Sequence, residues 1–143
     1  HEQSSYGINQ WLLPRWAGDY GDIKILGDLR WAYESIPALN PANGNYYGRY
    51  SKAGSETPIF CDSMWVSSWP LDTNSPPANL DGDPDNIYHN PPRFMMRFCI
   101  DRHNKAINVG FVDSHVEKVP LEDLWRLKWH RNFVPRDMVI PGL

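Results

Sequence analysis

The sequence predicts an α+β domain in which an antiparallel sheet of three or four strands is closed by a short C-terminal helix. Apolar and polar residues alternate over 107–112 and again over 116–119, which is the two-residue period of strands with one buried face. A polar turn at 113–115 separates the two runs, so they predict a β-hairpin. Helical spacing of apolar residues follows this hairpin.

The predicted helix begins at Pro120, where the missing backbone N–H costs nothing in a first helical turn. Glu122 and Asp123 place negative charge in that turn, which the helix dipole favours. One face of the helix carries Leu121, Leu124, Trp125 and Lys128. This pattern predicts a short amphipathic helix that folds back on the sheet.

Two further strands are predicted upstream of the hairpin. Residues 57–64, TPIFCDSM, have the pattern of a buried strand, and 93–100, RFMMRFCI, place apolar side chains at alternate positions. Between them, 69–92 is rich in Pro, Asn and Asp and is too long for a simple connection. We interpret it as a functional excursion or a loosely held flap.

The N-terminal third carries aromatic residues between frequent Gly and Pro residues. A short strand at 23–26 and one or two helical turns at 29–35 are predicted there, and Asn43-Gly44 indicates a turn. The whole chain holds seven Trp, seven Tyr, thirteen Pro and ten Gly. That composition predicts long loops fixed by large aromatic side chains.

Length and charge limit the function classes. A chain of 143 residues fits one domain, 1–143, with one core. A net charge of −3 gives no basic field, so we expect no nucleic-acid partner. No run of 18 apolar residues occurs in this sequence, and the chain as given spans no membrane.

The segment 103–135 resembles a known family. Nine residues lie between His103 and Asp113, which is similar to the H-x9-DG signature of pilin-like proteins with a prepilin-type cleavage and methylation segment. The tail DSHVEKVPLEDLWRLKWHRNFVP looks like the usual continuation, and FCDSMW with the following WP at 60–70 and SYGIN near the start are also similar. The family has Gly where this chain has Ser114. Positive φ there would cost Ser about 1 kcal/mol, and we expect a different turn type.

The resemblance implies a pilin-like globular head with a non-catalytic, structural role. Its subunit would belong to a type IV pilus-like fibre or a type II secretion pseudopilus, in an extracellular, cell-surface or periplasmic location. Its partners would be copies of itself or related pilins. Membrane contact would come only from an N-terminal apolar helix that this chain lacks, so we expect a soluble portion of a longer protein. A secreted protein after signal-peptide removal is the alternative.

A secreted carbohydrate-binding or adhesive module is the alternative function. Tyr46, Tyr47 and Tyr50 lie beside the Asn43-Gly44 turn, and exposed aromatic rings stack on ligands. Tyrosines in such a position more often cover a loop-rich core.

The two cysteines, Cys61 and Cys99, fall in the two predicted upstream strands. In an exported protein an even cysteine count favours a disulfide, worth about 3 to 4 kcal/mol by the chain-entropy argument. We predict that they pair. Two buried thiols on neighbouring strands are the alternative.

A calcium loop is the candidate cofactor site. Asp81, Asp83, Asp85 and Asn86 place oxygen ligands at close intervals on a tight loop, which suits a hard cation. The loop is not an EF-hand, because its twelfth position is Pro92 and not Glu. An ordinary solvated acidic turn is the alternative.

His103 and the residues at 113–115 are of types found in catalytic sites, but their placement does not suit catalysis. Adjacent Asp113, Ser114 and His115 cannot form a nucleophilic relay. A strand at 107–112 would separate His103 from Asp113 by about 20 Å, so we expect each to hold its own turn.

A metal-dependent hydrolase is the third and weakest candidate function. His115 and Glu117 lie on one face of the second hairpin strand, and His130 follows the predicted helix. Two imidazoles and a carboxylate can hold zinc. No phosphate-binding Gly loop or GxSxG elbow occurs in the sequence, and we expect no enzymatic activity.

Overall fold

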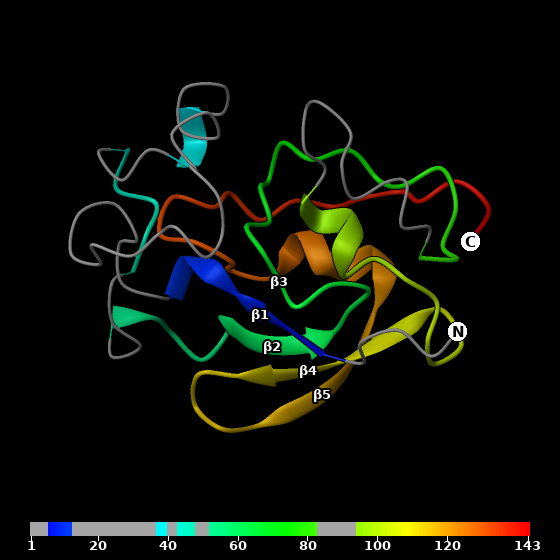
Figure 1. Ribbon diagram of the computed structural model, residues 1–143, viewed down its shortest axis with the longest axis horizontal. Helices are drawn as coiled ribbons and strands as arrows, with labels where there is room; N and C mark the ends of the chain where they lie inside the picture. Colours follow the sequence, from blue (N-terminus) through cyan, green and yellow to red (C-terminus); the bar gives the residue numbers. More distant parts are fainter. Residues whose placement is uncertain (1–5, 13–36, 40–42, 48–51, 83–93) are drawn as a thin grey trace.

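A computed structural model describes residues 6–12, 37–39, 43–47, 52–82 and 94–143 of the chain. Its centre is one five-stranded sheet with the strand order β3-β1-β2-β4-β5 (Figure 1). The strands are β1 (Tyr6–Asn9), β2 (Pro58–Asp62), β3 (Ser67–Ser68), β4 (Ala106–Phe111) and β5 (Val116–Pro120). All neighbouring strands are antiparallel except β1 and β3, which run parallel, so the sheet is mixed.

The predicted hairpin is confirmed. β4 and β5 pair in an antiparallel register that places Ile107 opposite Val119 and Gly110 opposite Val116. Residues 112–115 connect the two strands, so the connection begins one residue before the predicted turn at 113–115. The two-residue alternation is a reliable signal here because one face of β4 lies in the core.

The predicted α+β class is wrong, because the structure is mostly sheet with little helix. The helices are 3-10 turns: η1 (Gln10–Leu12), η3 (Pro37–Leu39), η7 (Phe94–Arg97) and η8 (Leu121–Arg126). Among the described residues none is longer than the six residues of η8, so the expected amphipathic C-terminal helix is replaced by a short 3-10 turn.

The end of η8 explains this difference. Leu127 has an extended backbone with φ −77 and ψ 151, and the N–H of Lys128 donates to the carbonyl of Glu56 at 3.1 Å. The chain therefore leaves the helix to bond with the segment before β2. Six residues form too few i→i−4 bonds to offset the cost of helix nucleation.

The predicted strand at 93–100 is also wrong, because η7 occupies its first half. Backbone N–H groups of Phe98 and Cys99 both donate to the carbonyl of Met95, at 3.1 and 3.0 Å, which coils the segment. Phe94, Met95, Met96, Phe98, Cys99 and Ile100 are all buried. A short run that is apolar all round does not distinguish a strand from a coiled segment.

The prediction of a strand within 57–64 is confirmed by β2, but the strand is buried on one face only, since Phe60 is 46% exposed. β1 and β3 were not predicted. β3 has only two residues, too few for a periodic signal. The predicted elements at 23–26 and 29–35 lie outside the described residues.

The core lies on the inner face of the sheet, under η7, η8 and the C-terminal tail. Asn9 is fully buried and fixes two distant segments, since its side-chain amide donates to the carbonyls of Pro58 and Trp129, both at 2.9 Å. The largest fully buried side chains are Trp11, Trp125, Trp129, Phe98 and Phe133. Indole N–H groups of the three tryptophans donate to the carbonyls of Pro70, Asn74 and Leu124.

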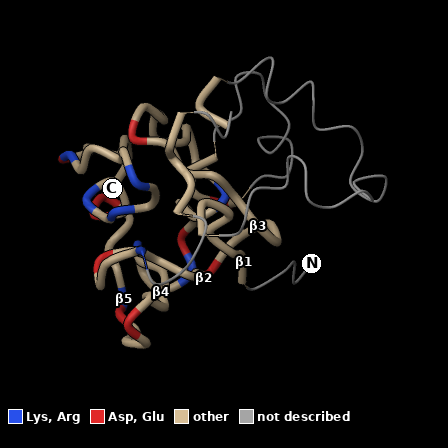
Figure 2. Tube along the Cα trace, turned by 90° about the vertical axis from the view of Figure 1, so that its left-hand side faces the viewer, with Lys and Arg blue, Asp and Glu red and all other residues tan. Residues whose placement is uncertain are grey.

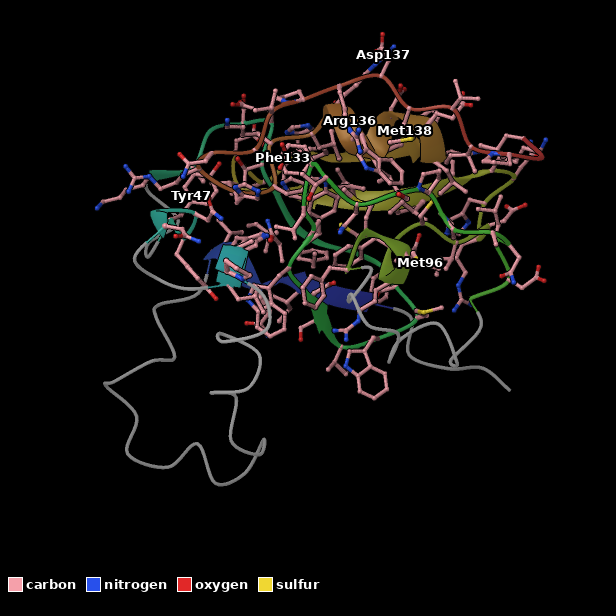
Figure 3. All side chains as sticks on the ribbon, turned by 90° about the horizontal axis from the view of Figure 1, so that it is seen from above. Tyr47, Met96, Phe133, Arg136, Asp137 and Met138 are labelled. Carbon is pink, nitrogen blue, oxygen red and sulfur yellow. The ribbon has the colours of Figure 1, made fainter. Side chains whose placement is uncertain are left out.

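The tail that follows η8 lies along this core. Arg136 reaches inward, and its guanidinium donates to the carbonyl of Asn74 at 3.0 Å, whereas Asp137 points outward (Figure 3). Arg126 forms ion pairs with Asp137 at 2.8 Å and with Asp123 at 3.0 Å. Acidic and basic positions are interspersed along the described chain (Figure 2).

Candidate functional site

The outer face of the sheet carries two parallel rows of residues, which together form the candidate functional surface. The register places Ile8, Phe60, Gly110 and Val116 side by side across β1, β2, β4 and β5, and we call these four the apolar row. Beside it lie Tyr6, Asp62, Asn108 and Lys118, which we call the polar row. Strand residues of one parity share a face, so both rows point away from the core.

The apolar row is open to solvent. Ile8 is 42%, Phe60 46% and Val116 67% exposed. The ring of Phe60 lies against Gly110, where an added Cβ would sit 2.9 Å from the ring. Tyr6, which is 60% exposed, meets Phe60 edge-on with ring centroids 6.5 Å apart. Large neighbouring apolar side chains left exposed in this way mark a contact surface.

Within the polar row, the buried carboxylate of Asp62 meets the imidazole of His103, which precedes β4. Asp62 is 5% exposed, and its Oδ2 accepts the backbone N–H of Asn108 at 2.7 Å and lies 3.0 Å from Nε2 of His103. The side-chain nitrogen Nδ2 of Asn108 lies 2.9 Å from the same Nε2. The carboxylate and the amide therefore hold the half-exposed imidazole in one orientation.

The expectation that His103 and Asp113 lie at opposite ends of a strand is confirmed. His103 precedes β4 and bonds to Asp62 of β2, while Asp113 follows β4 and bonds to His115. Each residue fixes its own turn. The two residues of the family motif therefore share no site and form no acid–base dyad.

Three charged or titratable side chains meet at the tip of the β4–β5 hairpin. The imidazole of His115 contacts Asp113 through Nδ1, and its Nε2 lies 3.1 Å from Oε1 of Glu117. The same ring stacks on Phe111, with centroids 4.3 Å apart and planes 1° from parallel. The Asp113 hydrogen bond raises the pKa of His115, and the His115 hydrogen bond lowers the pKa of Asp113.

The turn at this tip uses the positive φ that a glycine would favour. Ser114 has φ 76, its N–H donates to the carbonyl of Phe111 at 3.0 Å, and the N–H of Phe111 donates to the carbonyl of His115 at 2.9 Å. This is a three-residue hairpin loop with a left-handed residue in its last position. Our prediction of a different turn type is therefore wrong, and Ser114 carries strain of about 1 kcal/mol.

His130, the third residue of the predicted zinc hydrolase site, lies in the core. It is 3% exposed, and its ring packs between Trp11 and Phe133, with centroids at 5.0 and 5.2 Å. Neither ring nitrogen has a hydrogen-bond partner, and Nε2 lies 3.6 Å from Asp72, beyond hydrogen-bond length. Burial lowers the pKa of His130 to about 4, although the Asp72 carboxylate opposes the shift.

The predicted zinc site is not assembled in the described part of the chain, where no three His, Cys, Asp or Glu side chains are placed to hold a metal ion. His115, Glu117 and His130 therefore do not form a zinc site. For the candidate calcium loop, Asp81 is exposed, and Asp83, Asp85 and Asn86 lie outside the described residues.

Cys61 and Cys99 are free thiols in the structure, and the predicted disulfide is not formed. Both are buried, with exposures of 0% and 1%. Burial raises the pKa of both thiols, that of Cys99 to about 12. A thiol held neutral in this way is a poor nucleophile, so the pair contributes apolar packing to the core.

The tyrosines of the predicted carbohydrate site are core residues. Tyr46 is 8% and Tyr47 5% exposed, and the Tyr46 hydroxyl donates to the carbonyl of Leu39 at 3.3 Å. The Tyr47 hydroxyl lies 3.3 Å from that of Thr57, and burial raises its pKa. Tyr50 lies outside the described residues. Exposed aromatic rings are instead found at Tyr6, Phe60 and Trp65.

The sequence reasoning missed the outer-face residues of β1 and β2. YGIN alternates exposed and buried residues over its four positions, but it is too short to stand out in a periodicity search. Asp62 was missed as the partner of His103 because the two residues are far apart in the sequence. They meet only because β2 and β4 pair, which also lets Asp62 accept the backbone N–H of Asn108, 46 residues away.

Comparison with protein-family models, with curated proteins and with solved structures found no match. The pilin-like resemblance therefore stays a prediction. Within the described residues, no helix is long and apolar enough to cross a membrane.

Proposed function

We propose that this chain is a non-catalytic structural subunit of a filament, of the type IV pilus or type II secretion pseudopilus kind. One observation carries the proposal: His103 and Asp113, the residues on which the family resemblance rests, each tie down a different end of β4. Residues that stabilise separate turns maintain a scaffold. Catalytic residues would have to converge on one reacting atom.

The apolar row is the proposed contact surface within the filament. Its exposed side chains lie beside the polar row, which contributes the exposed ring of Tyr6 and the charged side chains of Asp62 and Lys118. A hydrophobic centre with a polar rim is the common composition of protein–protein interfaces. The partners would be other copies or related subunits, at the cell surface or in the periplasm.

An antibody raised against the chain tests the proposal in the cells that produce it. We expect the antibody to label filaments in electron micrographs of surface-sheared material. Recovery of the antigen only as a monomer, with no labelled filaments, would contradict the filament function.

Variants of the full reading frame test the surface separately. Phe60→Lys places a charge in the apolar row, and we expect it to abolish filament labelling while the protein accumulates normally. Val139→Lys is the matched control, because Val139 is 80% exposed in the C-terminal tail, away from the sheet. If Phe60→Lys assembled as well as Val139→Lys, the filament function could stand, but this face would not be its contact surface.

A carbohydrate-binding or adhesive module is a second candidate, favoured by one observation on the same face. Tyr6 and the ring of Phe60 are exposed next to Asn108 and the oriented imidazole of His103. Aromatic faces stack on the apolar side of sugar rings, and amide and imidazole groups bond hydroxyls, so the combination suits a glycan.

A glycan array probed with the purified chain tests this candidate. Binding that is lost in Phe60→Ala and retained in Val139→Ala would support it. A blank array, or binding that both variants retain, would contradict a glycan site on this face.

A further inference from the structure

The imidazole of His115 lies between two carboxylates that approach its two different nitrogens. Asp113 meets Nδ1, and Glu117 meets Nε2 at 3.1 Å. Ionised carboxylates only accept hydrogen bonds, and a neutral imidazole has a single N–H to donate. Both contacts are hydrogen bonds only when the ring carries two protons. The arrangement at the hairpin tip is therefore that of an imidazolium.

The backbone inside this cluster is held in an unfavourable conformation. Ser114 lies between Asp113 and His115 with φ 76. The same Asp113 carboxylate accepts the backbone N–H of His115 at 3.2 Å, so Asp113 bonds both the backbone and the side chain of His115. A left-handed non-Gly residue persists only where surrounding contacts hold it in place. The contacts of the imidazolium contribute to that hold.

We propose that the β4–β5 hairpin tip is a pH-sensitive clamp: the His115 imidazolium bridges Asp113 and Glu117 and closes the turn, and loss of one proton opens it. Deprotonation removes one of the two N–H donors, so one carboxylate loses its bond, and both carboxylates lose the positive charge that lay between them. The Ser114 backbone is then free to leave its left-handed conformation. The His115 ring no longer stays fixed over Phe111, which is 3% exposed beneath it.

The charged groups around His115 both favour the protonated form of its imidazole. Asp113 faces it from the turn and Glu117 faces it from β5, and both stabilise the imidazolium. β4 contributes the uncharged ring of Phe111. The neighbouring contact from the segment before β2 is also uncharged, since the carbonyl of Thr57 accepts the N–H of Val112 at 3.0 Å. These contacts raise the pKa of His115 above its ordinary value, and the Asp113 hydrogen bond is the largest cause.

Nuclear magnetic resonance of the isotopically labelled chain between pH 4 and 9 tests the clamp. We expect the ring signals of His115 to titrate with a midpoint above 6.5, and the amide signals of 113–117 to move with the same midpoint. Glu117→Gln keeps the side-chain shape and removes the charge, so we expect it to lower the midpoint. Asp113→Asn should lower it further, because the Asp113 bond is the largest cause of the shift.

Two controls separate the clamp from a merely structural hairpin. His115→Phe retains a ring over Phe111 but cannot titrate, and we expect the amide signals of 113–117 to lose their pH dependence while the hairpin stays folded. His103 lies at the other end of β4 and reports non-specific pH effects. A His115 midpoint at or below 6.5 would overturn the proposal. So would tip amides that titrate unchanged in His115→Phe.

Discussion

The turn at 129–133, which we call the buried turn because the side chains of Trp129, His130 and Phe133 are buried, and the exposed tip of the β4–β5 hairpin each contain a histidine. The two histidines are held in opposite ways. His130 is enclosed by aromatic rings and has no hydrogen-bond partner for either nitrogen. His115 is half exposed and has a carboxylate at each nitrogen. Burial lowers the pKa of the first to about 4, and the carboxylates raise the pKa of the second.

The difference shows which force holds each region. In the buried turn, apolar packing is strong enough to leave an imidazole unsatisfied, at a cost of about 1 to 3 kcal/mol. At the hairpin tip little apolar area is buried, so polar contacts set the conformation and even hold a left-handed serine. The buried turn should therefore respond most to loss of packing, and the tip to changes of charge and backbone.

The largest effect is expected from Trp129→Ala in the buried turn. Trp129 is 0% exposed and stacks on Phe98 with centroids 5.0 Å apart. Removing the indole leaves a cavity, and we expect a loss of about 3 to 5 kcal/mol in the free energy of unfolding, measured by urea denaturation. Val139→Ala, at an exposed site, is the control. A loss below about 1 kcal/mol would show that packing does not dominate this turn.

The next effect is the pH dependence produced by His130. Its folded-state pKa, about 4, lies below the ordinary value of 6.5, so the unfolded chain takes up the proton first as pH falls. Stability is therefore intact above pH 6.5 and is lost progressively down to pH 4, by up to about 3 kcal/mol. His130→Phe should remove this slope from denaturation curves recorded over that range.

His115→Phe is the matched substitution at the hairpin tip, and its sign is opposite. The raised pKa of His115 means that its contribution is complete below the unfolded-state pKa and is lost as pH rises through the folded-state pKa. Exposure makes this effect smaller than that of His130. Equal slopes of the same sign in the two variants would break the comparison.

The sequence predicted the hairpin well because its information is local. Alternation across β4 and β5, a polar turn and Pro120 all fall within fifteen residues of each other, and the predicted turn at 113–115 falls inside the 112–115 connection. Even so, the geometry of Ser114 was predicted wrongly. Whether a serine tolerates positive φ depends on the side chains around it, here Asp113 and His115.

The class and most of the candidate site could not be predicted, because they depend on contacts between distant segments. Six of the eight residues of 93–100 are apolar, so their alternate spacing did not reveal that the run coils. The helix after Pro120 was overpredicted because Lys128 bonds to Glu56, 72 residues earlier. The link between His103 and Asp62 likewise needs β2 and β4 as neighbours.

A fourth prediction extends the comparison to the sheet, where Phe60 is 46% exposed and Phe98 is fully buried. Phe98→Ala should cost about 3 to 5 kcal/mol. Phe60→Ala should cost about 1 to 1.5 kcal/mol, because only about half of the ring leaves water on folding. Thermal unfolding of both variants compares the two losses of stability. Equal losses would mean that the apolar row is part of the core and is not available as a contact surface.

The smallest effect, and the only stabilising one, is expected from Ser114→Gly at the hairpin tip. Glycine removes a left-handed strain of about 1 to 2 kcal/mol but gives the unfolded chain more freedom, which costs about 0.5 to 1 kcal/mol. The strain term is the larger, so we expect a net gain of about 0.5 to 1 kcal/mol by urea denaturation. Ser75→Gly is the control, because Ser75 is exposed and has no positive φ, and only the entropic cost remains there. A loss of stability at both positions would show that the Asp113 and His115 contacts, and not the backbone, determine this turn.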